Sequence, residues 1–168
     1  MSTIAIGDIH GHRDALVDLL DRLAGFASDD DTVVFLGDYI DRGPHSRECI
    51  DAILAFRGSV SANVVCLCGN HEDWMLQTMR DHRRHSWITG MEAFDTIRSY
   101  SADAEHALRE AIASAGLAFF LRKPPLPYES FFECLPPEHL AFFRNLQTFH
   151  RTADCVCVHG GLDPHGSI

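Results

Sequence analysis

Four short apolar runs are spread along the chain, and each predicts a β-strand. They cover residues 3–6, 32–36, 64–68 and 155–158. Between the first three runs, apolar residues recur every three or four positions, as they do on the buried side of a helix. These residues are Leu16, Leu19, Leu20 and Leu23 in the first interval and Ile50, Ile53 and Leu54 in the second. A strand–helix–strand order of this kind predicts an α/β fold whose sheet is parallel and whose crossovers are right-handed.

Glycine and serine mark where the first helices begin and end. Gly25 is expected to end the first helix, Ser46 to cap the second, and Gly58 to end it. Beyond the third strand the chain is more polar and predicts further helices, which a proline-rich stretch interrupts. We predict one domain over residues 1–168, with a mostly helical insertion at residues 73–150.

Each predicted strand is followed at once by a short polar segment. The four segments are GDIHG at residues 7–11, GDYIDRGP at residues 37–44, GNHE at residues 69–72 and HGG at residues 159–161. Ligands of open α/β sheets bind at the carboxyl ends of the strands, so these segments are expected to meet at one rim. A single Asp-x-His or Asp-Arg pair more often has a structural role. Four polar segments that each directly follow a predicted strand seldom arise by chance, so they indicate a functional site.

The side chains at this rim match a site for two divalent metal ions. Carboxylate, imidazole and amide oxygen together suit Mn, Fe or Zn, and a carboxylate can bridge two ions. Two such ions would lower the pKa of a shared water toward ~7 and neutralise a phosphate. Arg42 offers a planar fork for phosphate oxygens, His71 a proton for a leaving group, and Asp41 a partner that fixes the histidine tautomer.

In this order, the four segments resemble the signature of the calcineurin-like metallophosphoesterases. More narrowly, they are similar to the phosphoprotein phosphatase branch, which includes serine/threonine protein phosphatases and bacterial diadenosine tetraphosphatase-like enzymes. GDYIDRGP is the most specific element, and the stretch around Trp87, Gly90, Ser99 and Tyr100 is loosely similar to bacterial relatives. The resemblance implies a sandwich of two mixed β-sheets flanked by helices.

The resemblance also implies a role for each polar residue. Asp8 and His10 would bind the first metal ion, Asp38 would bridge both ions, and Asn70 and His159 would bind the second. In the reaction, Arg42 would bind the substrate phosphate, and His71 would act as general acid with Asp41 orienting it. The implied reaction is direct attack of a metal-bridged hydroxide on phosphorus, without a phosphoenzyme, and Mn is the expected metal.

The sequence departs from this family pattern after the HGG segment. The family has a further histidine ligand for the second ion and a further phosphate-binding arginine in its C-terminal part. Here His165 is the one histidine that follows, and it lies too close to His159 to match. We therefore expect a C-terminally short member, either a fragment or a chain completed by a partner. Alone, it should bind the second metal ion weakly and turn over slowly.

The expected function is metal-dependent phosphoester hydrolysis, with a phosphorylated protein as substrate of a serine/threonine phosphatase. An alternative is a hydrolase of dinucleoside polyphosphates such as diadenosine tetraphosphate, because both kinds of enzyme share every segment described above. An alternative of another class is a non-catalytic module that binds metal or a partner. The intact His71, Asp41 and Arg42 argue against that module.

Composition and hydropathy limit the partners and the cellular location that we expect for this protein. The chain has 24 acidic and 14 basic residues and a net charge of −10, so general nucleic-acid binding is not expected. No apolar stretch is long enough to cross a membrane and no secretory signal is present, which predicts a cytoplasmic protein. The paired cysteines at residues 66 and 68 and residues 155 and 157 are expected to be buried as small hydrophobic residues.

One basic cluster remains outside these motifs. Residues 82–85 read His-Arg-Arg-His in an otherwise acidic chain. A solvated helix face is the simpler interpretation of such a charge run, and contact with phosphate groups of a nucleotide or phosphopeptide is the alternative.

Overall fold

The first three predicted strands form one sheet in the computed structural model, which describes residues 2–162. The strands are β1 (Thr3–Ile6), β2 (Thr32–Phe35) and β3 (Asn63–Cys66). They pair in parallel in the order β1-β2-β3, with Ile6 beside Phe35 and Phe35 beside Cys66. Because the three carboxyl ends are in register, the polar segments that follow them begin at the same edge of the sheet.

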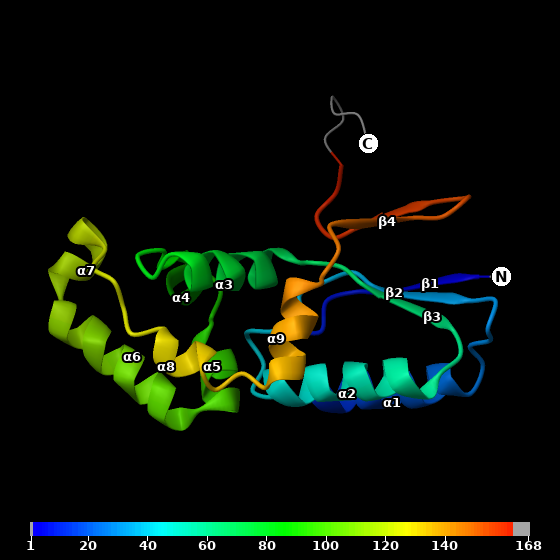
Figure 1. The fold of residues 1–168 in the computed structure, drawn as a ribbon, viewed down its shortest axis with the longest axis horizontal. Helices are drawn as coiled ribbons and strands as arrows, with labels where there is room; N and C mark the ends of the chain where they lie inside the picture. Colours follow the sequence, from blue (N-terminus) through cyan, green and yellow to red (C-terminus); the bar gives the residue numbers. More distant parts are fainter. Residues whose placement is uncertain (1, 163–168) are drawn as a thin grey trace.

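Two helices cover one face of this sheet, as the periodicity predicts. They are α1 (Arg13–Ala24) and α2 (Ser46–Ser59), which lie side by side below the strands (Figure 1). Their buried side chains are Leu16, Leu20 and Leu23 from α1 and Cys49, Ile50, Ile53 and Phe56 from α2. Leu19 departs from the predicted stripe, since it is 38 % exposed.

The ends of α2 differ from the prediction. Ser46 is the first residue of the helix rather than its cap, and Gly58 lies inside the last turn. Ser46 is fully buried, and its hydroxyl accepts a hydrogen bond from the backbone N–H of Asp41 at 3.2 Å. The serine therefore supports the loop after β2 instead of capping a helix.

A hairpin covers part of the other face of the sheet. It consists of β4 (Phe149–Arg151) and β5 (Val156–Val158), which pair antiparallel and lie across the sheet from α1 and α2 (Figure 1). Cys157 packs there against the buried cluster of Val34, Val65 and Leu67. A parallel bridge between Leu67 and Gln147 joins the chain before the hairpin to the end of β3. The predicted α/β arrangement of two sheets flanked by helices is confirmed.

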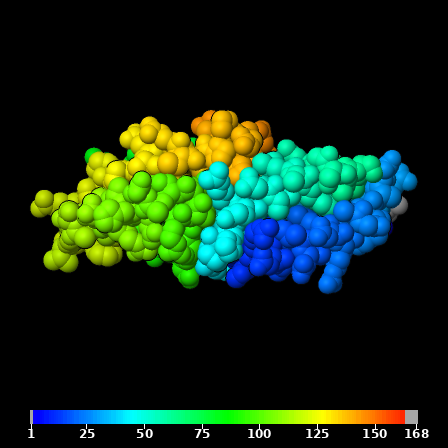
Figure 2. Space-filling view, turned by 90° about the horizontal axis from the view of Figure 1, so that it is seen from below, coloured from blue at the N-terminus to red at the C-terminus, as the bar shows by residue number. Residues whose placement is uncertain are grey.

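The chain between β3 and β4 is helical. Its helices are α3 (Asn70–Arg80), α4 (Ser86–Gly90), α5 (Phe94–Tyr100), α6 (Ala102–Ala115), α7 (Leu117–Arg122), α8 (Glu129–Phe132) and α9 (Pro137–Arg144). They extend beyond the carboxyl ends of the strands, so the molecule is elongated in both views (Figures 1 and 2). One hydrophobic core runs through both parts and includes Phe35 of β2 and Trp87 of α4. The boundaries of an insertion at residues 73–150 stay a prediction.

The cysteines follow the expected burial only in part. Cys49 and Cys66 are buried, and burial raises the pKa of their thiols to about 12 and about 11. The expectation is wrong for Cys155, which is exposed, as is Cys134. Within residues 2–162, no helix has the length and apolar character needed to cross a membrane.

Candidate metal centre

The five residues predicted to bind metal lie together at the carboxyl ends of the strands. Nε2 of His10 is 3.7 Å from a carboxylate oxygen of Asp8 and 3.6 Å from Oδ2 of Asp38. Nε2 of His159 is 3.4 Å from the same Asp38 oxygen and 2.9 Å from Oδ1 of Asn70. Four separate loops thus deliver their polar side chains to one place, as the positions of the segments predict.

The two histidines of this cluster are held with the same ring nitrogen facing Asp38. Nδ1 of His10 donates to the carbonyl of Ile40 at 3.0 Å, and Nδ1 of His159 donates to the carbonyl of Leu36 at 3.1 Å. A backbone acceptor on Nδ1 fixes the tautomer and leaves the Nε2 lone pair available, which is the arrangement of metal-binding histidines.

Asp38 is common to two groups of side chains that could each hold an ion. The groups are Asp8, Asp38 and His159, and His10, Asp38 and His71, whose ligand atoms lie within 4.8 Å of one another. Asp38 is buried, whereas the side chain of Asp8 is 53 % exposed, so the cluster opens to solvent at Asp8. This donor set of carboxylate, imidazole and amide oxygen fits divalent Mn, Fe or Zn.

Arg42 lies against the imidazoles of this cluster. Its Nη1 donates to Nε2 of His10 at 2.8 Å, and its Nη2 lies 3.3 Å from Nε2 of His71. A metal ion on His10 would need the same lone pair, so the guanidinium and an ion compete for that nitrogen. The guanidinium therefore lies within the centre. If an ion occupied Nε2 of His10, the guanidinium would be available to bind phosphate oxygens instead.

His71 and Asp41 form a buried pair next to Asp38. Nδ1 of His71 donates to Oδ2 of Asp41 at 2.8 Å, and both side chains are fully buried. Burial alone lowers the pKa of His71, but the hydrogen bond and charge of Asp41, together with the charge of Asp38, outweigh it and raise that pKa. A raised pKa favours the protonated imidazole that a general acid requires.

Trp87 of α4 and Thr96 of α5 also donate hydrogen bonds to the carboxylate of Asp41. Nε1 of Trp87 donates to Oδ2 at 2.9 Å, and the hydroxyl of Thr96 donates to Oδ1 at 2.7 Å. Burial raises the pKa of Asp41, while the donors His71, Thr96 and Trp87 act in the opposite direction. The sequence offered only a loose similarity around Trp87 and no signal for Thr96, because both partners lie far from Asp41 along the chain.

The loops at the centre hold several non-glycine residues in the left-handed backbone region. These are His10, Asp38, Asp41 and Arg42, with φ between 46° and 70°. Such a conformation costs roughly 1–2 kcal/mol per residue and is retained mainly at functional sites. Glycine is required beside them, since a Cβ on Gly69 would lie 2.1 Å from Oδ1 of Asp38.

Glu72 holds the Asp38 loop in this conformation. Its buried carboxylate accepts backbone N–H bonds from Asp38 and Tyr39 at 2.9 Å, from Gly69 at 3.0 Å and from Ile40 at 3.3 Å. Burial and the charge of Asp38 raise the pKa of Glu72 to about 7, against the effect of these N–H bonds. The sequence placed Glu72 in the GNHE segment but gave it no role.

Replacing Glu72 with alanine is expected to destabilise the protein. Glu72→Ala removes the acceptor for four backbone N–H groups. We expect the free energy of unfolding to fall by roughly 2–4 kcal/mol, because a buried donor without an acceptor costs about 1–3 kcal/mol. Urea unfolding measures the change, with Asp73→Ala at the neighbouring exposed position as control. Equal effects of the two substitutions would contradict the anchoring role.

Removing the indole donor of Trp87 is expected to affect turnover more than binding. Trp87→Phe keeps an aromatic ring against Phe131 but loses the bond to Asp41. We expect kcat for phosphate-ester hydrolysis to fall by roughly 5- to 20-fold with KM unchanged, since a hydrogen bond to a charged group contributes about 1.5–3 kcal/mol before the remaining donors compensate. A higher KM with an unchanged kcat would show that Trp87 does not act through Asp41.

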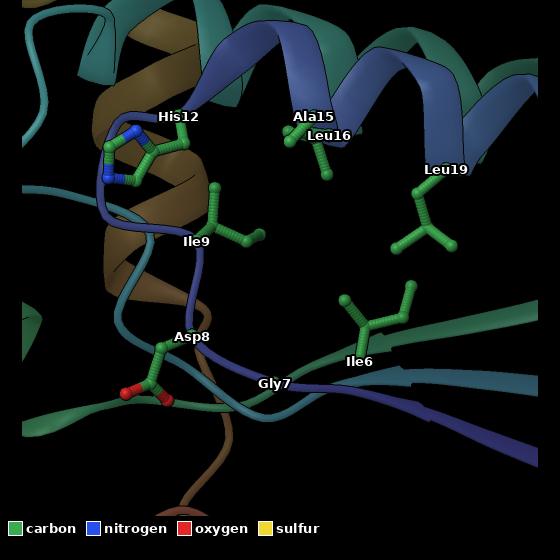
Figure 3. Close-up of a pocket in the computed structure, with 8 residues that line it drawn as sticks. All are labelled: Ile6, Gly7, Asp8, Ile9, His12, Ala15, Leu16 and Leu19. Carbon is green, nitrogen blue, oxygen red and sulfur yellow. The ribbon is translucent and has the colours of Figure 1, made fainter.

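An apolar hollow of about 370 Å³ lies beside the centre, between the end of β1 and α1. Its walls include Ile6, Leu16 and Leu19, whose side chains face one another in Figure 3. The carboxylate of Asp8 points away from these apolar side chains (Figure 3). The hollow explains why Leu19 is partly exposed, and its polar lining residues are Asp8 and His12.

Comparisons with known proteins agree with this arrangement. A bis(5'-nucleosyl)-tetraphosphatase (symmetrical) from Buchnera aphidicola is 42% identical over 129 residues, which cover 75% of this chain and 38% of that protein. The serine/threonine-protein phosphatase PP1-1 of Saccharomyces cerevisiae is 41% identical over 66 residues, which cover 39% of this chain and 21% of that protein. The crystal structure of a putative diadenosine tetraphosphatase superposes with a TM-score of 0.58 over 99% of this chain and 53% of that one, at 19% identity, and so supports the fold.

The chain spans less than half the length of these two curated relatives. The predicted site residues lie together, whereas His165 falls outside the described residues. The family model for calcineurin-like phosphoesterases matches residues 1–168. This match over the whole chain establishes that the chain belongs to the calcineurin-like phosphoesterase family.

Proposed function

We propose that this protein hydrolyses phosphate esters at a centre of two divalent metal ions. The observation that carries the proposal is the position of Asp38, whose Oδ2 lies 3.6 Å from Nε2 of His10 and 3.4 Å from Nε2 of His159, one predicted ligand of each ion. His71 and Arg42 lie at the same place, with Nε2 of His71 3.9 Å from Oδ2 of Asp38. A general acid and a phosphate-binding cation beside a shared carboxylate are the groups that this reaction needs.

Each residue of the metal centre would have its own role in the reaction. Asp8, His10, Asp38, Asn70 and His159 would hold the ions, which supply Lewis acidity and a water of lowered pKa. Arg42 would bind two oxygens of the substrate phosphate. As a water oxygen bonds to phosphorus and the bond between phosphorus and the ester oxygen breaks, His71 would give its Nε2 proton to that ester oxygen. Asp41 would keep the imidazole oriented through Nδ1.

Two substrate classes are compatible with this chemistry. A phosphorylated serine or threonine of a protein is the first, because a serine/threonine-protein phosphatase is 41% identical to this chain over 66 residues. A dinucleoside polyphosphate is the second. It is favoured by the tetraphosphatase relative, whose alignment extends over 75% of this chain, compared with 39% for the protein phosphatase.

Phosphate release measures the proposal directly. We expect slow hydrolysis of p-nitrophenyl phosphate with Mn and none after chelation with EDTA. A phosphoserine peptide and diadenosine tetraphosphate, compared at equal concentration, then separate the two substrate classes. Metal binding without hydrolysis of any of these compounds would refute the proposal and favour a non-catalytic binding module.

A further inference from the structure

A second cavity, which is polar, lies at the far end of α3, away from the metal centre. It has a volume of about 490 Å³, within the range of sites for small molecules. Its walls come from α3, from the loop that follows it, and from the end of α7. The lining residues are Trp74, Gln77, Thr78, Asp81, Arg83, Arg84, His85, Ser86 and Lys123.

The His-Arg-Arg-His cluster forms part of this cavity and is not a helix face. Residues 81–85 lie in the turn between α3 and α4. The buried hydroxyl of Thr78 donates to the carbonyl of Arg84 at 3.0 Å, and the N–H of Arg83 donates to a carboxylate oxygen of Asp81 at 3.0 Å. His85 is buried and stacks on Phe119 with ring centroids 4.8 Å apart. These contacts brace the backbone of the turn, and Nη1 of Arg84 donates to Oε1 of Gln77 on α3.

The third cation of the cavity comes from a distant part of the chain. Lys123 is the only lysine of the protein, and it ends α7 in the left-handed conformation with φ of 46°. The segment after Lys123 is hydrogen-bonded to the turn at residues 81–85, since the N–H of Leu126 donates to the carbonyl of His82 at 3.2 Å. Three cations thus face one carboxylate, that of Asp81, in a chain whose net charge is −10. A local excess of positive charge in an acidic protein favours an anionic ligand.

One face of α3 runs from the metal centre to this cavity, and the end of α4 packs on it, since Nδ2 of Asn70 donates to Sδ of Met91 at 3.6 Å. Asn70, Trp74, Gln77 and Asp81 follow one another at spacings of four, three and four residues, so they lie along one stripe of α3 and its C-cap. Asn70 contacts His159 at the centre, and the other three line the cavity. From Asn70 to Gln77 the helix rises by roughly 10 Å, at about 1.5 Å per residue.

We propose that this cavity binds phosphate groups of an oligophosphate chain, as a site separate from the metal centre. Arg83, Arg84 and Lys123 would bind the phosphate oxygens, and the hydroxyl of Ser86 can donate to them. The ligand is a nucleoside oligophosphate or an inorganic polyphosphate, since both present the same phosphate chain. Trp74 offers a ring on which a base could stack.

Calorimetric titration of the metal-free protein with inorganic tripolyphosphate tests the cavity on its own. We expect binding that weakens by roughly tenfold or more in Arg83→Ala/Arg84→Ala, because charge-assisted hydrogen bonds contribute about 1.5–3 kcal/mol each. Lys123→Gln should weaken it as well. Arg22→Ala/Arg57→Ala removes the same charge from exposed positions on α1 and α2 and should leave binding unchanged. Thermal unfolding confirms that each variant is folded.

Three results would overturn the proposal. The first is no binding of tripolyphosphate to the wild-type protein, and the second is equal loss in the two double variants, which would indicate a general charge effect. The third is binding of a doubly phosphorylated peptide in place of tripolyphosphate. Because the titration is done without metal, absence of hydrolysis would reject the proposed function and leave this result standing.

A comparison of ATP, tripolyphosphate and adenosine identifies the source of the phosphate chain. Equal affinity for ATP and tripolyphosphate supports an oligophosphate site that takes inorganic polyphosphate. Tighter binding of ATP, lost in Trp74→Leu, supports a site that takes nucleotides. Binding of adenosine with the same affinity as ATP would contradict recognition of phosphate and overturn the proposal.

Discussion

Asp38→Asn is expected to lower the affinity of the protein for Mn by more than 100-fold. Asp38 is the residue shared by both ligand groups, and its buried carboxylate lies 3.4 to 3.9 Å from three imidazoles. Loss of a residue that only supports a metal ligand costs roughly 10- to 100-fold in affinity, so loss of the bridging ligand itself should cost more. Calorimetric titration with Mn measures the affinity.

Asp14→Asn is the matched control for this substitution. Asp14 lies in the first turn of α1, and its side chain is 89% exposed, so the variant makes the same change of charge outside the centre. We expect its Mn affinity to equal that of the wild-type protein. If Asp38→Asn and Asp14→Asn bind Mn equally well, Asp38 does not bridge two ions.

His71→Asn is expected to slow hydrolysis of alkyl phosphates by roughly 100- to 10,000-fold, the usual contribution of a general acid. Asparagine cannot transfer a proton from the position of Nε2, which faces Asp38 and Arg42. The rate of phosphate release from a phosphoserine peptide, measured at high protein concentration, reports this loss. Mn affinity should change much less than in Asp38→Asn.

The leaving group provides an internal control for that role. p-Nitrophenolate leaves readily without a proton, so His71→Asn should slow hydrolysis of p-nitrophenyl phosphate far less than hydrolysis of an alkyl phosphate. An equal loss with both substrates would indicate that His71 supports the structure of the centre and is not the acid. Since His71 is buried, thermal unfolding of the variant is measured alongside.

The polar segments that carry the metal ligands could be placed from the sequence, because each follows a local pattern, an apolar strand. Each strand is a continuous apolar run, and the polar segment that follows it carries the ligands, as for Asp38 directly after β2. Parallel pairing in register then brings these segments together. The placement of Asp8 and His10 beside Asp38 follows from this order, whereas His159 comes from the separate hairpin of β4 and β5.

The partners of Asp41 could not be predicted in the same way. Trp87 and Thr96 lie 46 and 55 residues further along the chain, on short helices whose position depends on packing of the helical part. No local pattern marks a side chain that donates to a buried carboxylate so far away. Ser46 illustrates the same limit, because a serine before an apolar helix predicts a cap, whereas its buried hydroxyl contacts Thr96 and the backbone of Asp41.

The turn at residues 81–85 shows that a run of charged residues can line a cavity and need not form a solvated helix face. From the sequence, Arg83 and Arg84 fit a solvated helix face. In the structure, Thr78 and Asp81 hold them in a turn beside Lys123, at the wall of a cavity. The helices between β3 and β4 thus donate hydrogen bonds to Asp41 and line this cavity.

Electron paramagnetic resonance during titration with Mn tests the central claim most directly. Two ions bridged by Asp38 would lie about 3.5–4 Å apart, close enough for their spins to couple. We predict that the first equivalent of Mn binds more tightly than the second, and that the coupled signal grows with the second and is absent in Asp38→Asn. A spectrum of isolated Mn at every stage of the titration, or a coupled signal that persists in Asp38→Asn, would contradict a two-metal centre built on this residue.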